Sequence, residues 1–424
     1  MGDLIGSFEL YLSKYNDLML KLPIGVQNFV ELIEKECVYV DKTIYIYQLL
    51  QLGASSFFLS RPRRFGKSLL LSTMNAIFEG RKELFKGLYI FDKVDWGKQY
   101  SVIHLDMSGL ETRSAEKFED SLSFRLYSVA EEAGVTVTAT LPGDRLYELI
   151  DKLYFKTGQR VVVLVDEYDK PIQDVLHKPE LAAELREILR GFYTVIKSKS
   201  EKLHFAFLTG VSKISRVSVF SGLNNLMDLT LDGRFAGICG YTQEELEVNF
   251  KEYVAQLAAK ESLDRRQTLE NVKYWYNGYS WDGETFVYNP FSTLLLFDSR
   301  EFDPHWFRTG TPTFLLELME QRKDFSPVLD QAIIVDRTFS DTQTLERMDT
   351  VPLFFQTGYL TIKERVGEKY RLEIPNQEVK LSLSNFLLSR LTDRPEYEVK
   401  NLVEGIRQGL EQEDLEAAIR YLPL

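Results

Sequence analysis

The sequence is poor in the residues that build disulfide frameworks and zinc sites. It has two cysteines, Cys37 and Cys239, which lie far apart and have no C-x-x-C spacing, so neither kind of site is expected. None of the four histidines has a partner at metal-ligand spacing. Neither a G-x-S-x-G elbow nor an H-E-x-x-H motif is present. The cysteine usage favours a reducing compartment.

Long apolar runs are also missing. No stretch approaches the ~18 uninterrupted apolar residues of a membrane helix. Residues 1–20 carry Asp3 and Glu9 in place of the basic start and apolar block of a signal peptide. We therefore expect a cytoplasmic protein with no membrane partner.

Basic residues are outnumbered by acidic ones. The chain has 51 Lys and Arg against 63 Asp and Glu, a formal net charge of −12 and a pI of about 5.1. This balance argues against a protein whose whole surface grips nucleic acid, but it leaves a local basic groove open.

The sequence does have the composition and pattern of a large soluble α/β protein. Its 424 residues, 44% hydrophobic and 27% charged, suffice for two or three domains with cores of their own. Alternating strand and helix signals predict a three-layer fold with a parallel sheet and right-handed crossovers. The expected strands are 56–59, 101–105, 161–165, 203–208 and a short one at 229–231, and the expected helices are 67–79, 115–133, 144–157 and 180–197.

Residues 56–68 predict a phosphate-binding loop. An apolar run leads into R-P-R-R-F-G-K-S at 61–68, which matches G-x-x-x-x-G-K-[ST] except that Arg61 replaces the first glycine. The backbone N–H groups of such a loop and the start of the next helix attract phosphate, the lysine bridges the β- and γ-phosphates, and the hydroxyl binds Mg²⁺. The strand before the motif and the helix after it favour this interpretation over a chance G-K-S.

We therefore expect ATP with Mg²⁺ as the ligand. Its expected contacts are Arg61, Pro62, Arg63, Arg64, Phe65, Gly66, Lys67, Ser68 and Leu69. The three arginines would favour a polyphosphate strongly, although a solvated basic turn is the alternative.

Asp166 and Glu167 follow the most apolar strand of the chain. Residues 161–165 are five consecutive apolar residues, typical of a central strand of a parallel sheet. A carboxylate at the end of such a strand is costly unless it is paired or binds metal. We assign Asp166 to Mg²⁺ and Glu167 to the attacking water as general base. The interval between Lys67 and Asp166 leaves room for an intervening strand. Asp169 is a weaker candidate, with capping of a helix as its alternative.

Polar and basic residues also follow the 203–208 strand. Thr209 ends it at a position suited to contact the γ-phosphate, although threonine also ends strands for turn reasons. Lys213 and Arg216 follow in a basic turn. Either could act as a γ-phosphate sensor or arginine finger, or lie in an exposed turn; of the two we assign Arg216, with Lys67 and Thr209, to catalysis.

The character of the sequence changes after Tyr241. Thr242 and Glu245 form a capping-box pattern that predicts a helix start. Six aromatics then cluster in a short stretch that either stacks bases or forms a small core: Trp275, Tyr276, Tyr279, Trp281, Phe286 and Tyr288. Strands are expected at 353–363 and 370–374, a loop around Glu378, and a helix pair at 401–421.

These motifs together resemble the predicted AAA-ATPase-like family of bacterial proteins. The resemblance covers nearly everything from residue 20 onward, and its R-P-R-R-F-G-K-S string is highly specific. Within that family the missing first glycine is usual. The segments that carry it are 21–25, 39–43, 60–68, 165–171, 209–213, 220–226, 276–279, 288–291 and 309–312.

The resemblance implies an additional-strand P-loop ATPase with a catalytic glutamate. It predicts an N-terminal extension (1–20), an AAA-like ATPase domain (21–241), a helical or winged-helix-like lid (242–325) and an α+β region (326–424). Family members usually continue into a PD-(D/E)XK nuclease domain. No such domain is found up to Leu424, and Glu378-x-Lys380 lacks a suitable preceding Asp, so we expect the nuclease to be absent.

The expected function is Mg²⁺-dependent ATP hydrolysis coupled to a partner. Two alternatives stay open. One is a nucleotide-gated binding module with little turnover, and the other is a nucleic-acid-processing ATPase of a defence or mobile-element system. Nucleic acid and a second copy of the chain are the candidate partners besides nucleotide.

Overall fold

The structure is a computed structural model that describes residues 19–213, 225–306, 319, 332–340, 350–392 and 394–411. The predicted extension over residues 1–20 falls almost wholly outside these ranges. Arg216 and residues 412–421 of the predicted closing helix pair also lie outside the described residues.

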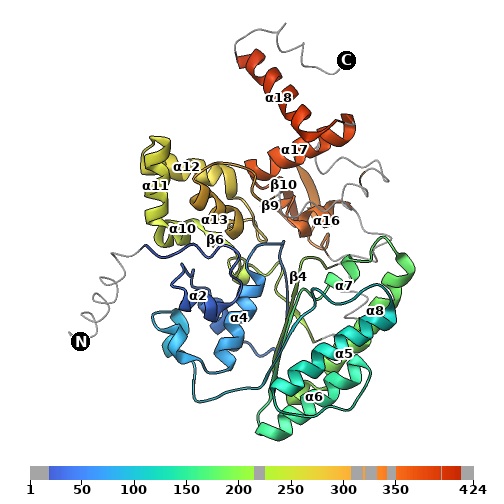
Figure 1. Cartoon of the computed structure of the whole chain (residues 1–424). Coiled ribbons are helices and arrows are strands. Elements are labelled where there is room, and N and C mark those ends of the chain that lie inside the picture. The colour runs from blue at the N-terminus through green and yellow to red at the C-terminus, as the bar shows by residue number, and fades with distance from the viewer. Residues whose placement is uncertain are drawn as a thin grey trace, which may run out of the picture.

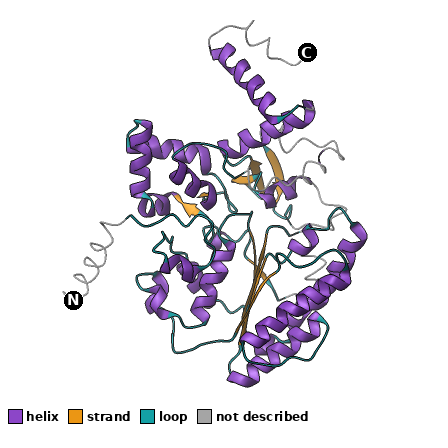
Figure 2. Cartoon of the chain, viewed as in Figure 1, coloured by secondary structure: helices purple, strands orange, loops and turns teal. Residues whose placement is uncertain are grey.

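A five-stranded parallel sheet forms the centre of the N-terminal half (Figures 1 and 2). Its strand order is β2-β3-β4-β1-β5. The strands are β1 (Ser56–Ser60), β2 (Val102–Asp106), β3 (Val161–Asp166), β4 (Leu203–Gly210) and β5 (Met227–Asp228). The predicted parallel α/β sheet is thus confirmed. The expected strand between the phosphate loop and β3 in the sequence is β2, which lies at one edge of the sheet. The last strand, β5, lies slightly earlier in the sequence than expected.

Helices cover both faces of the sheet (Figure 1). They are α2 (Phe29–Glu34), α3 (Thr43–Leu50), α4 (Lys67–Phe78), α5 (Ala115–Glu132), α6 (Pro142–Thr157), α7 (Lys170–Gln173) and α8 (Pro179–Ser198). Because successive strand residues point to opposite faces, Phe57 and Leu59 pack with α4, whereas Phe58 packs with α6 and α8. Both faces are apolar, so the central strands read as continuous hydrophobic runs.

A helical group follows the sheet. It consists of β6 (Tyr241–Thr242), α10 (Gln243–Asn249), α11 (Lys251–Glu261), α12 (Arg265–Tyr276), β7 (Val287–Tyr288) and α13 (Pro290–Ser299). The predicted capping box is present, with Thr242 accepting from the Glu245 N–H and the Glu245 carboxylate accepting from the Thr242 N–H. Glu245 also pairs with Lys42 of the N-terminal half at 2.6 Å.

Most of the aromatic cluster is core. Tyr276, Tyr279, Trp281 and Tyr288 are each at most 4% exposed, as the simpler interpretation of this stretch predicted. They cannot present their faces to a base in this structure.

The C-terminal region combines a small antiparallel sheet with helices. Its elements are β8 (Ile333–Asp336), α16 (Thr350–Thr357), β9 (Thr361–Val366), β10 (Lys369–Glu373), α17 (Gln377–Thr392) and α18 (Glu396–Glu411), with strand order β8-β10-β9. The turn after α16 approaches the phosphate loop closely, since a Cβ on Gly358 would lie 3.0 Å from Pro62.

Two expectations for this region were wrong. The stretch predicted as a strand over 353–363 begins as helix α16, whose apolar side chains are buried in the core that reaches the phosphate loop, so tertiary packing overrides the strand propensity of its aromatics. Glu378, expected in a loop, lies in the first turn of α17. Within the described residues no helix is long and apolar enough to cross a membrane.

Candidate nucleotide-binding site

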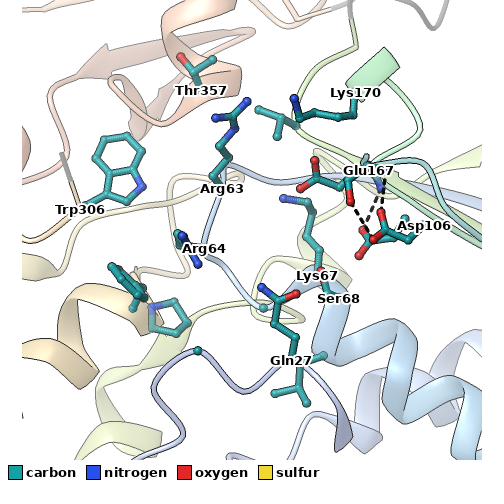
Figure 3. A pocket seen from close by; sticks show the side chains of 18 of the residues that line it. Gln27, Arg63, Arg64, Lys67, Ser68, Asp106, Glu167, Lys170, Trp306 and Thr357 are labelled. Carbon is teal, nitrogen blue, oxygen red and sulfur yellow. Dashed lines mark hydrogen bonds between the residues drawn. The ribbon is translucent and has the colours of Figure 1, made fainter. Parts of the chain in front are cut away.

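A cavity of about 640 Å³ opens at the carboxyl ends of the sheet strands (Figure 3). Parallel α/β sheets place their ligands at this edge. The walls come from the segment before α2, the phosphate loop, the ends of β2 and β3, the segment after β4, and helices α7, α13 and α16. The C-terminal half therefore closes a cavity whose floor belongs to the N-terminal half.

The phosphate loop has the backbone of an anion-binding turn. Arg64 and Gly66 both adopt left-handed conformations, with φ of 68° and 91°. Gly66 is also the N-cap of α4 and supplies no side-chain hydrogen bond to the helix. The first N–H groups of this 12-residue helix are thus not capped by a side chain and can donate to a phosphate.

Lys67 and Ser68 start this helix and line the cavity. The Lys67 ammonium is 5% exposed and donates to the carbonyls of Arg61 and Pro62, each at 3.0 Å. Loop carbonyls satisfy the ammonium in this arrangement, and phosphate oxygens are stronger acceptors for the same group. Ser68 forms a side-chain hydrogen bond with Asp166.

Asp166 and Glu167 face the same cavity from the end of β3. Burial raises the pKa of Asp166, while Ser68 and Lys67 act in the opposite direction. Burial likewise raises the pKa of Glu167, with Lys67 again opposing the shift. Glu167 has a φ of 50°, a conformation that non-glycine residues adopt rarely and that tends to occur at functional sites.

Thr209 is the penultimate residue of β4, the strand that lies between β1 and β3 in the sheet. It pairs with Leu59 in register, is fully buried, and its Oγ1 has no hydrogen-bond partner among the described residues. Thr209 does not line the cavity itself, whereas Val211 and Ser212 just beyond it do. Because buried hydroxyls normally form a hydrogen bond, the Thr209 hydroxyl calls for an explanation such as a contact with a ligand or water.

Lys213 serves to join two regions. It is 2% exposed, pairs with Asp228 at 2.8 Å, and its backbone N–H donates to Gln356 of α16 at 2.9 Å. The segment after β4 is thus bonded directly to the C-terminal region. The alternative of an exposed turn is wrong at this position, because the side chain is buried and paired.

The side chain of Arg61 does not face the cavity, contrary to expectation. Its guanidinium is fully buried, lies 3.9 Å from the ring centre of Trp281, and donates to the carbonyls of Ser60, Thr230 and Phe235. Burial lowers its pKa to about 10. Arg61 fills the position of the first glycine by turning inward, where it fixes the base of the loop.

Pro62 and Phe65 also point away from the cavity. Phe65 packs edge-on against Tyr279 and Trp281, and Pro62 lies against Gly358. Of the nine loop residues expected to contact nucleotide, six line the cavity: Arg63, Arg64, Gly66, Lys67, Ser68 and Leu69.

Sequence reasoning missed several lining residues. Asp106 ends β2 directly opposite Asp166 in the parallel register, and Ser108 donates to its carboxylate twice, at 2.8 Å from both the N–H and the hydroxyl. The signal existed, because Asp106 is a polar residue ending a predicted strand. The further lining residues beyond the loop include Pro23, Val26, Gln27, Lys170, Gln173, Pro290, Phe291, Leu294, Trp306 and Thr357.

The residues present fit ATP and Mg²⁺. The cavity has a basic side with Arg63, Arg64 and Lys67, an acidic side at the end of β3, and apolar walls from Pro290 and Leu294. The Ser68 hydroxyl and the Asp166 carboxylate, already hydrogen-bonded, are hard oxygen ligands of the kind Mg²⁺ takes together with phosphates and water.

Comparison with known proteins agrees with this geometry. The sequence model of a family described as "Predicted AAA-ATPase" matches residues 23–220. A protein of Azotobacter chroococcum mcd 1, described as an uncharacterized protein in the vnfD 5' region, is 45% identical over 381 residues, which are 88% of this chain and 71% of the relative. The family match spans the phosphate loop, β3 and β4.

Proposed function

Since the chain belongs to the predicted AAA-ATPase family, we propose that it binds ATP with Mg²⁺ in the cavity above the sheet and hydrolyses it. The observation that carries the proposal is the meeting of Lys67 and Glu167 at one cavity from two different elements. A phosphate-binding lysine and a half-buried glutamate with a raised pKa are the two groups that such hydrolysis needs closest to the reacting phosphate.

Each residue has a distinct role. The Lys67 ammonium would leave the carbonyls of Arg61 and Pro62 to hold the β- and γ-phosphates. Ser68 and Asp166 would hold Mg²⁺, which neutralises phosphate charge when it is bound. Thr209, whose buried hydroxyl has no partner among the described residues, is the remaining polar group that we assign to the terminal phosphate or the attacking water.

Glu167 acts as the general base. The water oxygen forms a bond to the γ-phosphorus as the bond to the bridging oxygen breaks, the electron pair of that bond stays on ADP, and the water proton passes to the Glu167 carboxylate. Burial raises the pKa of this group, so it accepts a proton more readily than an exposed glutamate would.

Nucleotide binding is the first step to test. Titration with Mg²⁺–ATP is expected to give saturable binding to the wild type and a large loss in Lys67→Ala. Lys251→Ala, on the exposed side of α11, serves as the matched control because its side chain is 65% exposed. Equal affinity of all three proteins would contradict the assignment of the loop.

A nucleotide-gated binding module is the second candidate. The hydrogen bonds of Lys213 and Ser212 favour it, because they join the cavity wall both to the segment after β3 and to α16. Tight binding of Mg²⁺–ATP with no phosphate release in a prolonged assay would select this function over hydrolysis. A role in nucleic-acid processing stays a prediction from the family resemblance.

A further inference from the structure

The three arginines of the phosphate loop have three different surroundings. Arg61 is locked below the loop by carbonyls and Trp281. Arg64 lies with its guanidinium 4.7 Å from the ring centre of Phe291 on α13. Arg63 is exposed to the cavity and forms a long hydrogen bond of 3.4 Å to Gln173 of α7. A ligand would take over the Arg63 guanidinium at the cost of one long hydrogen bond, whereas Arg64 would also have to leave the Phe291 ring.

Arg63 lies beside the proposed general base. Figure 3 shows Arg63, Glu167 and Lys170 around one end of the cavity, with Lys67 between them and Ser68. The guanidinium of Arg63 is close enough to Glu167 to lower the pKa of that carboxyl against the dominant effect of burial. The place where the terminal phosphate must meet water is therefore also within the field of Arg63.

The backbone of the phosphate loop places the Arg63 side chain at the cavity. Arg63 stands between Pro62, which has a fixed φ, and Arg64, which is left-handed. The left-handed residues Arg64 and Gly66 turn the chain into the start of α4 directly after residue 63. Arg63 and Lys67 thus line the same cavity from two sides of this turn, Arg63 from the loop and Lys67 from the helix.

We propose that Arg63 is the catalytic arginine of this ATPase, supplied by the chain's own phosphate loop to the γ-phosphate. This inference rests on the proposed function. As the bond to the bridging oxygen breaks, negative charge grows on that oxygen and on the phosphoryl oxygens, and a planar guanidinium neutralises it with paired N–H donors. One chain then carries every charge that the reaction needs, and a neighbouring copy need not donate an arginine.

The inference is tested with full-length Arg63→Ala and Arg63→Lys. Arg266→Ala on α12, an arginine whose side chain is 87% exposed, is the matched control. With saturating Mg²⁺–ATP, kcat of both Arg63 variants is expected to fall by about 1,000-fold or more, since a finger arginine contributes on that scale. Affinity for Mg²⁺–ADP is expected to change by less than about tenfold, because the contact strengthens only as charge develops.

A second readout does not depend on turnover. Wild type is expected to bind Mg²⁺–ADP with aluminium fluoride, a mimic of the transferring phosphoryl group, far more tightly than Mg²⁺–ADP alone. Arg63→Ala is expected to lose that difference. The specific activity of the wild type is expected to be independent of protein concentration over the range in which the chain is monomeric.

The outcomes separate this inference from the proposed function. An active wild type with an equally active Arg63→Ala overturns the role of Arg63 and leaves the ATPase intact. Equal losses in kcat and in Mg²⁺–ADP affinity also overturn it, since Arg63 would then be a ground-state ligand. Activity that rises with self-association and survives Arg63→Ala assigns the arginine to a second copy. A wild type that binds nucleotide without turnover overturns both.

Discussion

The carboxylate of Asp169 holds Ser212 by two hydrogen bonds to one oxygen, from the backbone N–H at 2.8 Å and from the hydroxyl at 2.7 Å. Asp169 follows the Asp-Glu pair after β3, and Ser212 follows β4. Gly210 makes room for this contact, because a Cβ there would lie 2.3 Å from the Asp169 carboxylate. The two strand ends that carry the proposed catalytic groups are therefore bonded to each other, and Lys213 extends the connection to α16.

Asp169 is expected to be important for stability as well as for activity. It is 1% exposed, and its carboxylate also accepts from Gln173 and the Val211 N–H. Asp169→Asn places two donors where acceptors are needed, and the free energy of unfolding is expected to fall by about 2 kcal/mol. Urea denaturation measures it, with the exposed Asp95→Asn as control. An unchanged midpoint in Asp169→Asn would contradict the structural role of this bond.

Arg61 is expected to behave unlike its neighbour Arg63. Arg61→Ala leaves three buried carbonyls without donors, and Arg61→Lys cannot reach all three with one ammonium, so both variants are expected to lose about 2–4 kcal/mol of unfolding free energy. Arg63→Ala, which removes an exposed side chain, is expected to unfold within about 0.5 kcal/mol of the wild type. Paired urea titrations measure both, and equal stability of Arg61→Ala and Arg63→Ala would contradict the anchoring role of Arg61.

Glu378 gives the structure a defined pH dependence. It is fully buried, accepts from Ser292 Oγ at 2.9 Å and the Trp306 N–H at 2.8 Å, and burial raises its pKa to about 7 from an ordinary 4.5. The folded state thus holds a proton that the unfolded state has released between these two values. The contribution of Glu378 to stability is greatest below the lower value, falls as pH rises through this window, and is constant above it.

Comparison with Glu378→Gln isolates this effect from all other titrations. Relative to the wild type, Glu378→Gln is expected to gain about 3 kcal/mol of unfolding free energy when the pH is raised from about 5 to about 8. Chemical denaturation of both proteins across this range measures the difference. A difference between the two proteins that does not vary with pH would show that Glu378 does not titrate in this window.

The parallel sheet was predictable because its central strands β1 and β3 are buried on both faces. The apolar residues at 161–165 can only be a central strand, and the ends of such strands meet at one edge, so Lys67 and Glu167 were expected at a common site. Local motifs with a fixed backbone, such as the capping box at Thr242, were likewise predictable because nearby residues determine them.

Side-chain direction and long-range walls were not predictable. The three arginines at positions 61, 63 and 64 looked alike in the sequence, and only the proximity of Trp281 and of the carbonyls of Thr230 and Phe235, far along the chain, turns Arg61 inward. The same holds for Trp306 and Thr357, which line the cavity because the C-terminal region folds back over the loop. Periodicity carries no information about such contacts.

Phosphate release at saturating Mg²⁺–ATP decides whether this cavity hydrolyses ATP. Wild type, Glu167→Gln and Lys67→Ala are compared, with Glu252→Gln on the exposed side of α11 as control. We predict turnover by the wild type and the control that stops when Mg²⁺ is chelated, and a loss of about 100- to 10,000-fold in Glu167→Gln, which still binds ATP. Equal phosphate release by the wild type, Glu167→Gln and Lys67→Ala would contradict the assignment of this cavity as the site of ATP hydrolysis.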